Sequence, residues 1–236
     1  MKAGIIAAGE GSRLAKSHPG TVKPMICVAA KPLIYWVVGG LRSAGCKDIV
    51  VLTNSRGNAV GPYLTAAFPD VKFDFVTADT ASSFESFRLV SKRIAETATD
   101  GGFVVSTVDA LIKTDDVARF IRECRESNAD AGLALTKFVD DEKPLWADTD
   151  AKGRVTALGA DAKDKNAVTC GLYYMTRKAA ERLPGADGYS KLRDFWRGLV
   201  ASGETVMGVT LSKSLDVDRP EDLAAAEKFL IVETNR

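Results

Sequence analysis

Short apolar runs and longer amphipathic stretches alternate through the first half of the chain. The apolar runs are typical of strands that are covered on both faces, and the stretches between them have the period of helices. We therefore expect strands at 2–8, 48–54, 71–77 and 102–109, with helices near 32–44, 57–67, 82–97 and 114–127. Strands that alternate with helices in this way predict right-handed βαβ units and a largely parallel sheet.

In the second half, apolar runs follow one another with few helical stretches between them. We expect strands at 131–138, 145–150, 153–159, 167–176 and 205–212, and helices at 177–183 and 190–202. The turn sequence Asp150-Ala151-Lys152-Gly153 predicts a hairpin, so some of these strands should join the sheet in antiparallel orientation. Pro220 and the acidic residues that follow it indicate the first turn of a final helix.

This order of elements predicts an α/β fold in three layers, with helices on both faces of a mixed, mostly parallel central sheet of the Rossmann-like kind. A hydrophobic content of 46% is enough to bury a core of that size. No repeat, low-complexity segment or linker interrupts the sequence, so residues 1–236 are expected to form a single domain.

Charge and cysteine content argue against several classes of partner. The chain has 32 basic and 31 acidic residues, a net charge of +1, so no overall charge attracts nucleic acid or an anionic membrane. No apolar run approaches the ~20 residues that a membrane span needs. The cysteines at 27, 46, 124 and 170 form no C-x-x-C pair and mostly lie in apolar runs, which favours a reducing cytoplasm.

The segment from Ile5 to Pro24 carries the first candidate chemistry. Glycines at 9 and 11 follow its apolar strand and let backbone N–H groups face an oxyanion, while Arg13 and Lys23 add positive charge. The P-loop is excluded because no Lys-Ser or Lys-Thr pair follows these glycines at the required distance. The dinucleotide fingerprint is excluded because Leu14 stands at its third glycine. The segment predicts a phosphate-binding turn, and the alternative is a structural turn beside a solvated lysine.

Three aspartates are candidate ligands for a metal ion. Asp109 ends an apolar strand, at the edge where α/β sheets bind their ligands. Asp216 and Asp218 alternate, so on a strand they would face the same side, where a cation would relieve their repulsion. Mg²⁺ prefers such oxygen ligands. We favour Asp109 and Asp216 as ligands, and the alternative, for Asp218 above all, is capping of a helix.

Together these motifs resemble the nucleotidyltransferase (NTP transferase) family, which includes sugar-phosphate nucleotidyltransferases and MobA-like enzymes. The family sequence A-G-G-x-G-[ST]-R and its later Lys-Pro correspond to residues 8–13 and 23–24, and its [DE]-x-D-T-P-E-D-L-like segment corresponds to residues 216–223. The chain departs from the pattern in having Ala7-Ala8-Gly9 where sugar nucleotidyltransferases often have a glycine pair, in Val108 before the first acid and in Arg219 for threonine. The resemblance spans nearly the whole chain and implies a GT-A-like nucleotidyltransferase fold.

The resemblance also implies a role for each motif. The triphosphate would be held through the nucleotide-binding residues Ala8, Gly9, Gly11 and Ser12. As catalytic residues, Arg13 would bind the departing pyrophosphate and Lys23 would neutralise charge on the α-phosphate. The metal ion would be Mg²⁺, with Asp109, Asp216 and Asp218 as its ligands.

Recognition of the base and of the acceptor is less clearly marked in the sequence. The nucleotide-binding half would be residues 1–112, and its base-reading hydroxyls are predicted to be those of Ser82, Ser83 and Ser86. The acceptor-binding half would be residues 113–236, where Gly171 resembles the glycine of the family's G-x-Y segment, on which an acceptor ring rests. Lys143 and Lys191 are further acceptor-binding candidates, and solvated surface lysines are the alternative for both.

The expected reaction is a Mg²⁺-dependent transfer of an NMP group from an NTP to a phosphorylated small molecule, such as a sugar phosphate, with release of pyrophosphate. A phosphomonoester is already ionised near neutral pH and needs no general base, which agrees with a chain whose single histidine, His18, lies in a loop. The alternatives are a molybdopterin-type guanylyl- or cytidylyltransferase, a glycosyltransferase of related fold and a non-catalytic nucleotide-binding regulator. The sequence names neither the acceptor nor the base, and it leaves a homodimer open.

Overall fold

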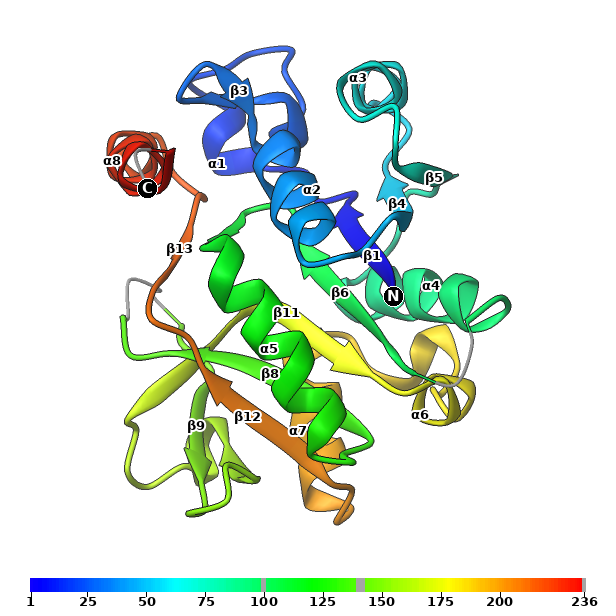
Figure 1. Ribbon diagram of the computed structural model, residues 1–236, viewed down its shortest axis with the longest axis vertical. Helices are drawn as coiled ribbons and strands as arrows, with labels where there is room; N and C mark the ends of the chain where they lie inside the picture. The colour runs from blue at the N-terminus through cyan, green and yellow to red at the C-terminus, as the bar shows by residue number, and fades with distance from the viewer. Residues whose placement is uncertain (99–100, 139–142, 235–236) are drawn as a thin grey trace.

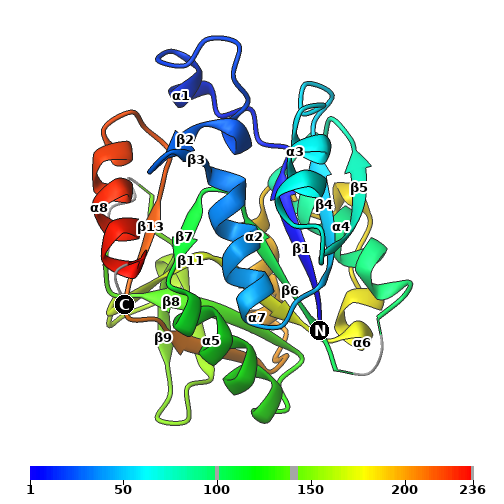
Figure 2. The same cartoon turned by 45° about the horizontal axis from the view of Figure 1, so that its top comes forward.

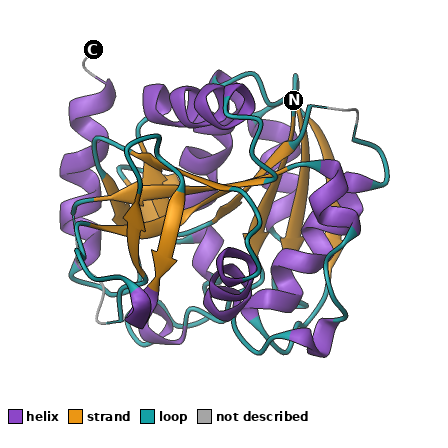
Figure 3. Ribbon diagram, turned by 90° about the horizontal axis from the view of Figure 1, so that it is seen from below, coloured by secondary structure: helices purple, strands orange, loops and turns teal. Residues whose placement is uncertain are grey.

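The computed structural model describes residues 1–98, 101–138 and 143–234. Within them a nine-stranded sheet lies between two layers of helices (Figures 1 and 3). The strand order is β10-β9-β11-β6-β1-β4-β5, and β8 pairs with both β11 and β12. The strands are β1 (Lys2–Ala7), β4 (Asp48–Thr53), β5 (Lys72–Thr77), β6 (Phe103–Thr107), β8 (Ala131–Thr136), β9 (Trp146–Thr149), β10 (Val155–Leu158), β11 (Ala167–Met175) and β12 (Val206–Thr210).

Helices and two small strand pairs complete the described part of the chain. The helices are α1 (Ser12–Ala15), α2 (Leu33–Ser43), α3 (Val60–Ala67), α4 (Ser83–Ala95), α5 (Thr114–Glu126), α6 (Arg177–Glu181), α7 (Leu192–Ala201) and α8 (Asp222–Thr234). The small pairs are antiparallel, β2 (Cys27–Val28) with β3 (Lys31–Pro32) and β7 (Ala110–Ile112) with β13 (Ser214–Asp216). None of the helices in these residues is both long enough and apolar enough to cross a membrane.

The direction of the strands confirms the predicted mixed, mostly parallel sheet. The pairs β1–β4, β1–β6, β4–β5 and β8–β12 are parallel, whereas β11 is antiparallel to β6, β8 and β9, and β10 is antiparallel to β9. Among the described strands of this sheet, therefore, β10 and β11 run one way and the other seven run the opposite way. The carboxyl ends of β1, β4 and β6 consequently meet at one edge, as ligand-binding α/β sheets require.

The two faces of the sheet are covered by different sets of helices. Ile5, Val51 and Val104 belong to the core under α2, α3 and α5, and the neighbouring strand residues Leu52 and Val105 belong to the core under α4, α6 and α7. This alternation explains why the strands are apolar throughout. The close approach of α4 to β1 depends on Gly4, since a Cβ there would lie 2.2 Å from Cγ1 of Val90.

A third core joins the beginning of the chain to its end. Leu14 of α1 and Ile26 are buried with Leu215 of β13 and with Phe229 and Leu230 of α8. Figure 2 shows α8 beside β13 and close to β2 and β3. This packing holds the segment that follows the glycine turn against the segment around Asp216 and Asp218.

The predicted elements are present, and the bounds of those given by residue range are shifted by three residues at most. Two details of the final segment differ from expectation. Strand β13 ends at Asp216, so Asp218 lies beyond it, and Pro220 lies in a turn before α8, which begins at Asp222. The β7–β13 pair was not predicted because its three-residue strands are too short to show a period.

The four cysteines differ sharply in exposure. All are free thiols, and Cys46, Cys124 and Cys170 are buried while Cys27 is exposed. Burial raises the pKa of Cys46 to about 11 and that of Cys170 to about 12, and it also raises the pKa of Cys124. A thiol reagent at neutral pH should therefore modify one cysteine in the native protein and four after denaturation, as counted by mass spectrometry. Rapid modification of a second thiol in the native protein would contradict this burial.

Candidate active site

A pocket of about 410 Å³ opens at the carboxyl ends of β1 and β6. It begins at the turn after β1, where Gly11 has φ 58° and ψ 34° and precedes α1. This left-handed backbone conformation favours glycine. The residues that line the pocket are Ile6, Gly9, Gly11, Ser12, Arg13, Lys23, Thr107, Val108, Asp109 and Asp218. The structure thus brings the glycine turn, both predicted catalytic cations and two of the predicted metal ligands into one pocket.

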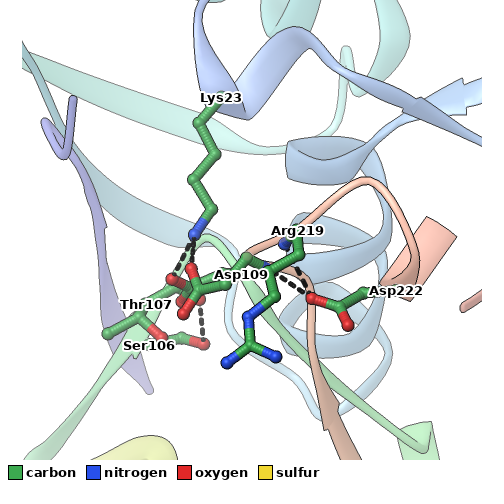
Figure 4. Close-up of polar contacts among 7 residues, drawn as sticks. Lys23, Ser106, Thr107, Asp109, Arg219 and Asp222 are labelled. Atoms are coloured by element: carbon green, nitrogen blue, oxygen red, sulfur yellow. Dashed lines mark hydrogen bonds and ion pairs between the residues drawn. The ribbon is translucent and has the colours of Figure 1, made fainter. Parts of the chain in front are cut away.

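Lys23 makes the central contact of this pocket. Its Nζ donates to Oδ2 of Asp109 at 2.7 Å and also to Oδ1 of Asp218 (Figure 4). Lys23 is only 6% exposed although it carries a charge. Burial alone would lower the pKa of this lysine, but the two carboxylates outweigh burial and hold the pKa above its ordinary value. Lys23 is therefore a charged ammonium held between two carboxylates.

Asp109 is held in its ionised form by the same contacts. Burial opposes ionisation, but Lys23 and a hydrogen bond from the Thr107 hydroxyl together lower the pKa of the Asp109 carboxyl. The loop that carries Asp109 is fixed by two backbone hydrogen bonds, from Val108 N to Ile6 O at 3.1 Å and from Val217 N to Asp109 O at 3.1 Å. The second bond ties the Asp109 loop directly to the segment that carries Asp218.

Asp218, and not Asp216, shares Lys23 with Asp109. The first residue of α8, Asp222, accepts hydrogen bonds from the backbone N of Asp218 at 2.8 Å and of Arg219 at 2.7 Å, which fixes this turn (Figure 4). Asp216 is exposed and lies opposite Ala110 in the β7–β13 pair. The expectation that both aspartates alternate on one strand is therefore wrong, because the strand ends between them, and the geometry favours Asp218 as the partner of Asp109.

The Asp109 and Asp218 carboxylates fit a hard divalent cation. They come from distant parts of the chain and converge on a single positive group. The described residues contain no group of three or more His, Cys, Asp or Glu side chains arranged around a metal position. Two carboxylates are what Mg²⁺ commonly uses when phosphate oxygens and water complete its shell.

Gly11 has a second role that the sequence did not show. A Cβ at this position would lie 2.8 Å from Cβ of Lys23 and 3.4 Å from its Cγ and Cδ. The aliphatic stem of Lys23 thus runs directly against the glycine turn on its way to the two carboxylates. Any side chain at Gly11 would therefore collide with the stem of Lys23.

A second pocket, of about 470 Å³, adjoins the glycine turn and contains residues that sequence reasoning missed. Asn54 is buried, with its Nδ2 donating to Ala8 O at 3.1 Å and its Oδ1 accepting from Arg56 N at 3.1 Å. Asp79 accepts a hydrogen bond from Ser55 N at 2.9 Å. Asn54 directly follows the buried strand β4, and Asp79 lies two residues after β5, so a position near the carboxyl end of a strand, the signal that identified Asp109, applied to both.

The three serines predicted to read a base edge have partners inside the fold. Ser82 caps α4 by accepting from Glu85 N at 3.0 Å, and Ser83 Oγ accepts from Leu192 N at 3.0 Å. Ser86 is buried, and its hydroxyl lies 2.6 Å from that of Thr80 and 3.2 Å from Ser82 O. Ser82 and Ser83 each keep a free O–H donor in these contacts, so their role in reading a base stays a prediction, while the residues of the second pocket lie directly beside the glycine turn.

The acceptor-binding candidates lie outside the two pockets just described. Gly171 has φ 64°, and a Cβ there would lie 2.4 Å from Thr107 Oγ1 and 2.7 Å from Ala110 Cβ. A glycine is therefore needed at this position for the close approach of β11 to the Asp109 loop. This packing explains the glycine without the expected contact to an acceptor ring. Lys143 and Lys191 are exposed, and the Lys143 carbonyl accepts from Arg193 Nη2 at 2.8 Å. Their binding of an acceptor stays a prediction.

Comparison with known proteins gives relatives of one kind. A bifunctional IPC transferase and DIPP synthase from Rubrobacter xylanophilus is 29% identical over 245 residues, covering 97% of this chain and 52% of that protein. A low-salt glycan biosynthesis nucleotidyltransferase from Haloferax volcanii is 25% identical over 241 residues, covering 98% of this chain and 66% of that protein. The chain thus spans about half to two-thirds of the length of these curated relatives.

The fold and the family agree with the resemblance seen in the motifs. The structure of the inositol-1-phosphate CTP transferase from T. maritima matches with a TM-score of 0.83 at 18% identity, covering 98% of this chain and 95% of that chain, which shows a shared fold. The family model of the MobA-like NTP transferase domain matches residues 3–197, from β1 into α7. The protein is therefore a member of the MobA-like NTP transferase domain family.

Proposed function

We propose that the protein transfers an NMP group from an NTP to a sugar phosphate or polyol phosphate, with Mg²⁺ as its cofactor and pyrophosphate as the second product. The observation that carries the proposal is the convergence of Lys23, Asp109 and Asp218 in the pocket formed by the glycine turn. Such a pocket supplies cations and carboxylates where a metal-bound triphosphate has to bind.

In the proposed reaction, an oxygen of the acceptor phosphate forms a bond to the α-phosphorus while the bond to the bridging oxygen of pyrophosphate breaks. Backbone N–H groups of Gly9 and Gly11 would bind the phosphates, and Arg13 would neutralise the charge that develops on pyrophosphate. Lys23 would bind an oxygen of the α-phosphate and so orient the phosphorus for in-line attack. Asp109 and Asp218 would hold Mg²⁺, which would supply further positive charge to the phosphate oxygens. No side chain has to remove a proton, since the attacking oxygen is already ionised.

We assign the first half of the chain to the nucleotide and the second half to the acceptor, with one exception. Residues 1–112 contain the phosphate turn and the adjoining pocket, so we assign them to the nucleotide. Residues 113–236 are assigned to the acceptor, but Asp218 of this half completes the metal site. Four free cysteines accord with a cytoplasmic location, which is part of the proposal.

For the substrates, we propose CTP and a cyclic polyol phosphate as the first pair to examine. The first curated relative is named an IPC transferase, and the structural neighbour is named an inositol-1-phosphate CTP transferase. A molybdopterin guanylyl- or cytidylyltransferase is the second candidate, since the matching family model is the MobA-like one.

Purified protein with Mg²⁺, one of ATP, CTP, GTP or UTP, and pooled polyol and sugar phosphates should release pyrophosphate. We expect release to require one nucleotide and one acceptor pool, with inositol 1-phosphate and CTP as the pair of first choice. A coupled pyrophosphate assay measures it. Nucleoside diphosphate release from a nucleotide sugar would instead support a glycosyltransferase, and pyrophosphate release only with a molybdopterin acceptor would support the second candidate.

Substitution of the central residues should abolish most of this activity. Asp109→Asn and Lys23→Met should each lower kcat by roughly 100-fold or more, because the first weakens the binding of Mg²⁺ and the second removes the positive charge at the α-phosphate. Lys16→Met is the matched control, since Lys16 is exposed in the same loop and carries the same charge. Its kcat should stay within about twofold of the wild type, as is usual for exposed positions away from a site. If either substitution leaves pyrophosphate release unchanged, the substituted residue has no role in the reaction.

Gly11→Ala should separate the packing role of the turn from its backbone conformation. The substitution puts a Cβ against the stem of Lys23, so kcat should fall by roughly tenfold or more as the ammonium is displaced. Gly20→Ala is the matched control, because Gly20 also has positive φ, at 79°, but a Cβ there meets no atom within 4 Å. Both substitutions strain the backbone by about 1–2 kcal/mol. Equal losses of kcat in the two variants would show that backbone strain, and not contact with Lys23, is responsible.

A further inference from the structure

In the described structure the Lys23 ammonium occupies the position between the Asp109 and Asp218 carboxylates. Figure 4 shows the Lys23 side chain extending toward Asp109, and its Nζ donates to Oδ2 of Asp109 and to Oδ1 of Asp218. Two carboxylates on one side of a pocket repel each other unless a positive charge lies between them. Lys23 provides that charge, and it therefore does for the two acids what a divalent ion would do.

The placement of Lys23 is built into the fold. Its stem is packed against Gly11, and its backbone belongs to the 3₁₀ turn Lys23–Met25, in which Ile26 N donates to Lys23 O at 3.1 Å. The side chain is 7% exposed, compared with 27% for Asp109 and 48% for Asp218. The lysine is thus the buried member of the cluster, and the acids present their remaining surface to the pocket.

Charge balance limits what can bind beside this lysine. With Lys23 between them, the two carboxylates leave one net negative charge, since two negative charges are offset by one positive charge. Adding a divalent ion while Lys23 stays in place would bring two positive groups onto the same oxygens, at a distance where their repulsion is strong. The phosphates of a nucleotide would change this balance, because they offer the ammonium another anionic partner.

We propose that Lys23 is the resident cation of the Asp109–Asp218 pair in the free protein, and that a divalent metal ion replaces it there only when nucleotide phosphates draw the ammonium away. The inference rests on the proposed function for the identity of the metal ligands. It implies an order of binding, in which the metal ion enters with the nucleotide and the free protein binds metal poorly. The required movement is small, because only the end of the Lys23 side chain has to turn toward the phosphates.

Mn²⁺ binding without nucleotide tests this exchange directly. Free Mn²⁺ can be titrated by electron paramagnetic resonance against the full-length wild type, Lys23→Met and the control Lys16→Met. We expect Lys23→Met to bind one Mn²⁺ about tenfold or more tightly than the wild type, and Lys16→Met to bind like the wild type. Adding Asp109→Asn to Lys23→Met should abolish the gained site. Mn²⁺ should also raise the Tm of Lys23→Met more than that of the wild type.

Equal Mn²⁺ affinity in the wild type and Lys23→Met would overturn the exchange, as would a gain in affinity of the same size in Lys16→Met, which would reflect only the general loss of positive charge. If Lys23→Met does not fold, Lys23→Gln, which keeps hydrogen-bond donors but no charge, takes its place in the same titration. Pyrophosphate release by the wild type is measured separately. If Lys23→Met gains metal binding but the wild type releases no pyrophosphate, the exchange of cations is supported and the proposed reaction is refuted.

Discussion

The structure of the site depends on one buried ammonium that is shared by two carboxylates. Lys23, Asp109 and Asp218 are separated by 86 and 195 positions along the chain, yet they meet at a single nitrogen. Burying a charge costs several kcal/mol unless it is paired and hydrogen-bonded. The fold satisfies this requirement by bringing three segments to one edge of the sheet, namely the loop after β1, the end of β6 and the turn before α8.

Several backbone features follow from that requirement. Gly11 leaves room for the lysine stem, and Gly171 leaves room for β11 beside Thr107, whose hydroxyl is bonded to Asp109. Asp222 fixes the turn of Asp218 through two backbone N–H groups. The third core, which packs α1 and Ile26 against β13 and α8, holds the first and last of these segments together. These contacts explain how residues so far apart in sequence keep one geometry.

The sequence predicted the fold well because its signals are local. Apolar strands and amphipathic helices have short periods, and these were enough for the strand and helix order and for the mostly parallel sheet. The same logic located Asp109, which lies two residues after the buried strand β6. It applied equally to Asn54 and Asp79, although neither was singled out.

What the sequence could not predict depends on where a strand ends and on which groups already have partners. The alternation of Asp216 and Asp218 gave no sign that β13 stops at Asp216, because that end is set by pairing with β7, over 100 residues away. The hydroxyls of Ser82 and Ser86 were expected to read a base edge, which stays a prediction, and in the structure they also take part in a helix cap and in a contact with Thr80. Long-range pairing leaves no periodic trace in the sequence, whereas the cap of Ser82 matches the local S-x-x-E pattern of residues 82–85 and was open to prediction.

In the proposed exchange, the Asp109–Asp218 pair binds Lys23 in the free protein and a metal ion in the complex with nucleotide. A crystal structure with Mg²⁺ and an NTP analogue that has a methylene group between the α- and β-phosphorus atoms would locate both cations. We predict Mg²⁺ bound to oxygens of Asp109 and Asp218, with the Lys23 ammonium moved onto an α-phosphate oxygen. A structure in which the nucleotide is bound while Lys23 still joins both carboxylates, with the metal ion elsewhere, would refute the exchange of cations.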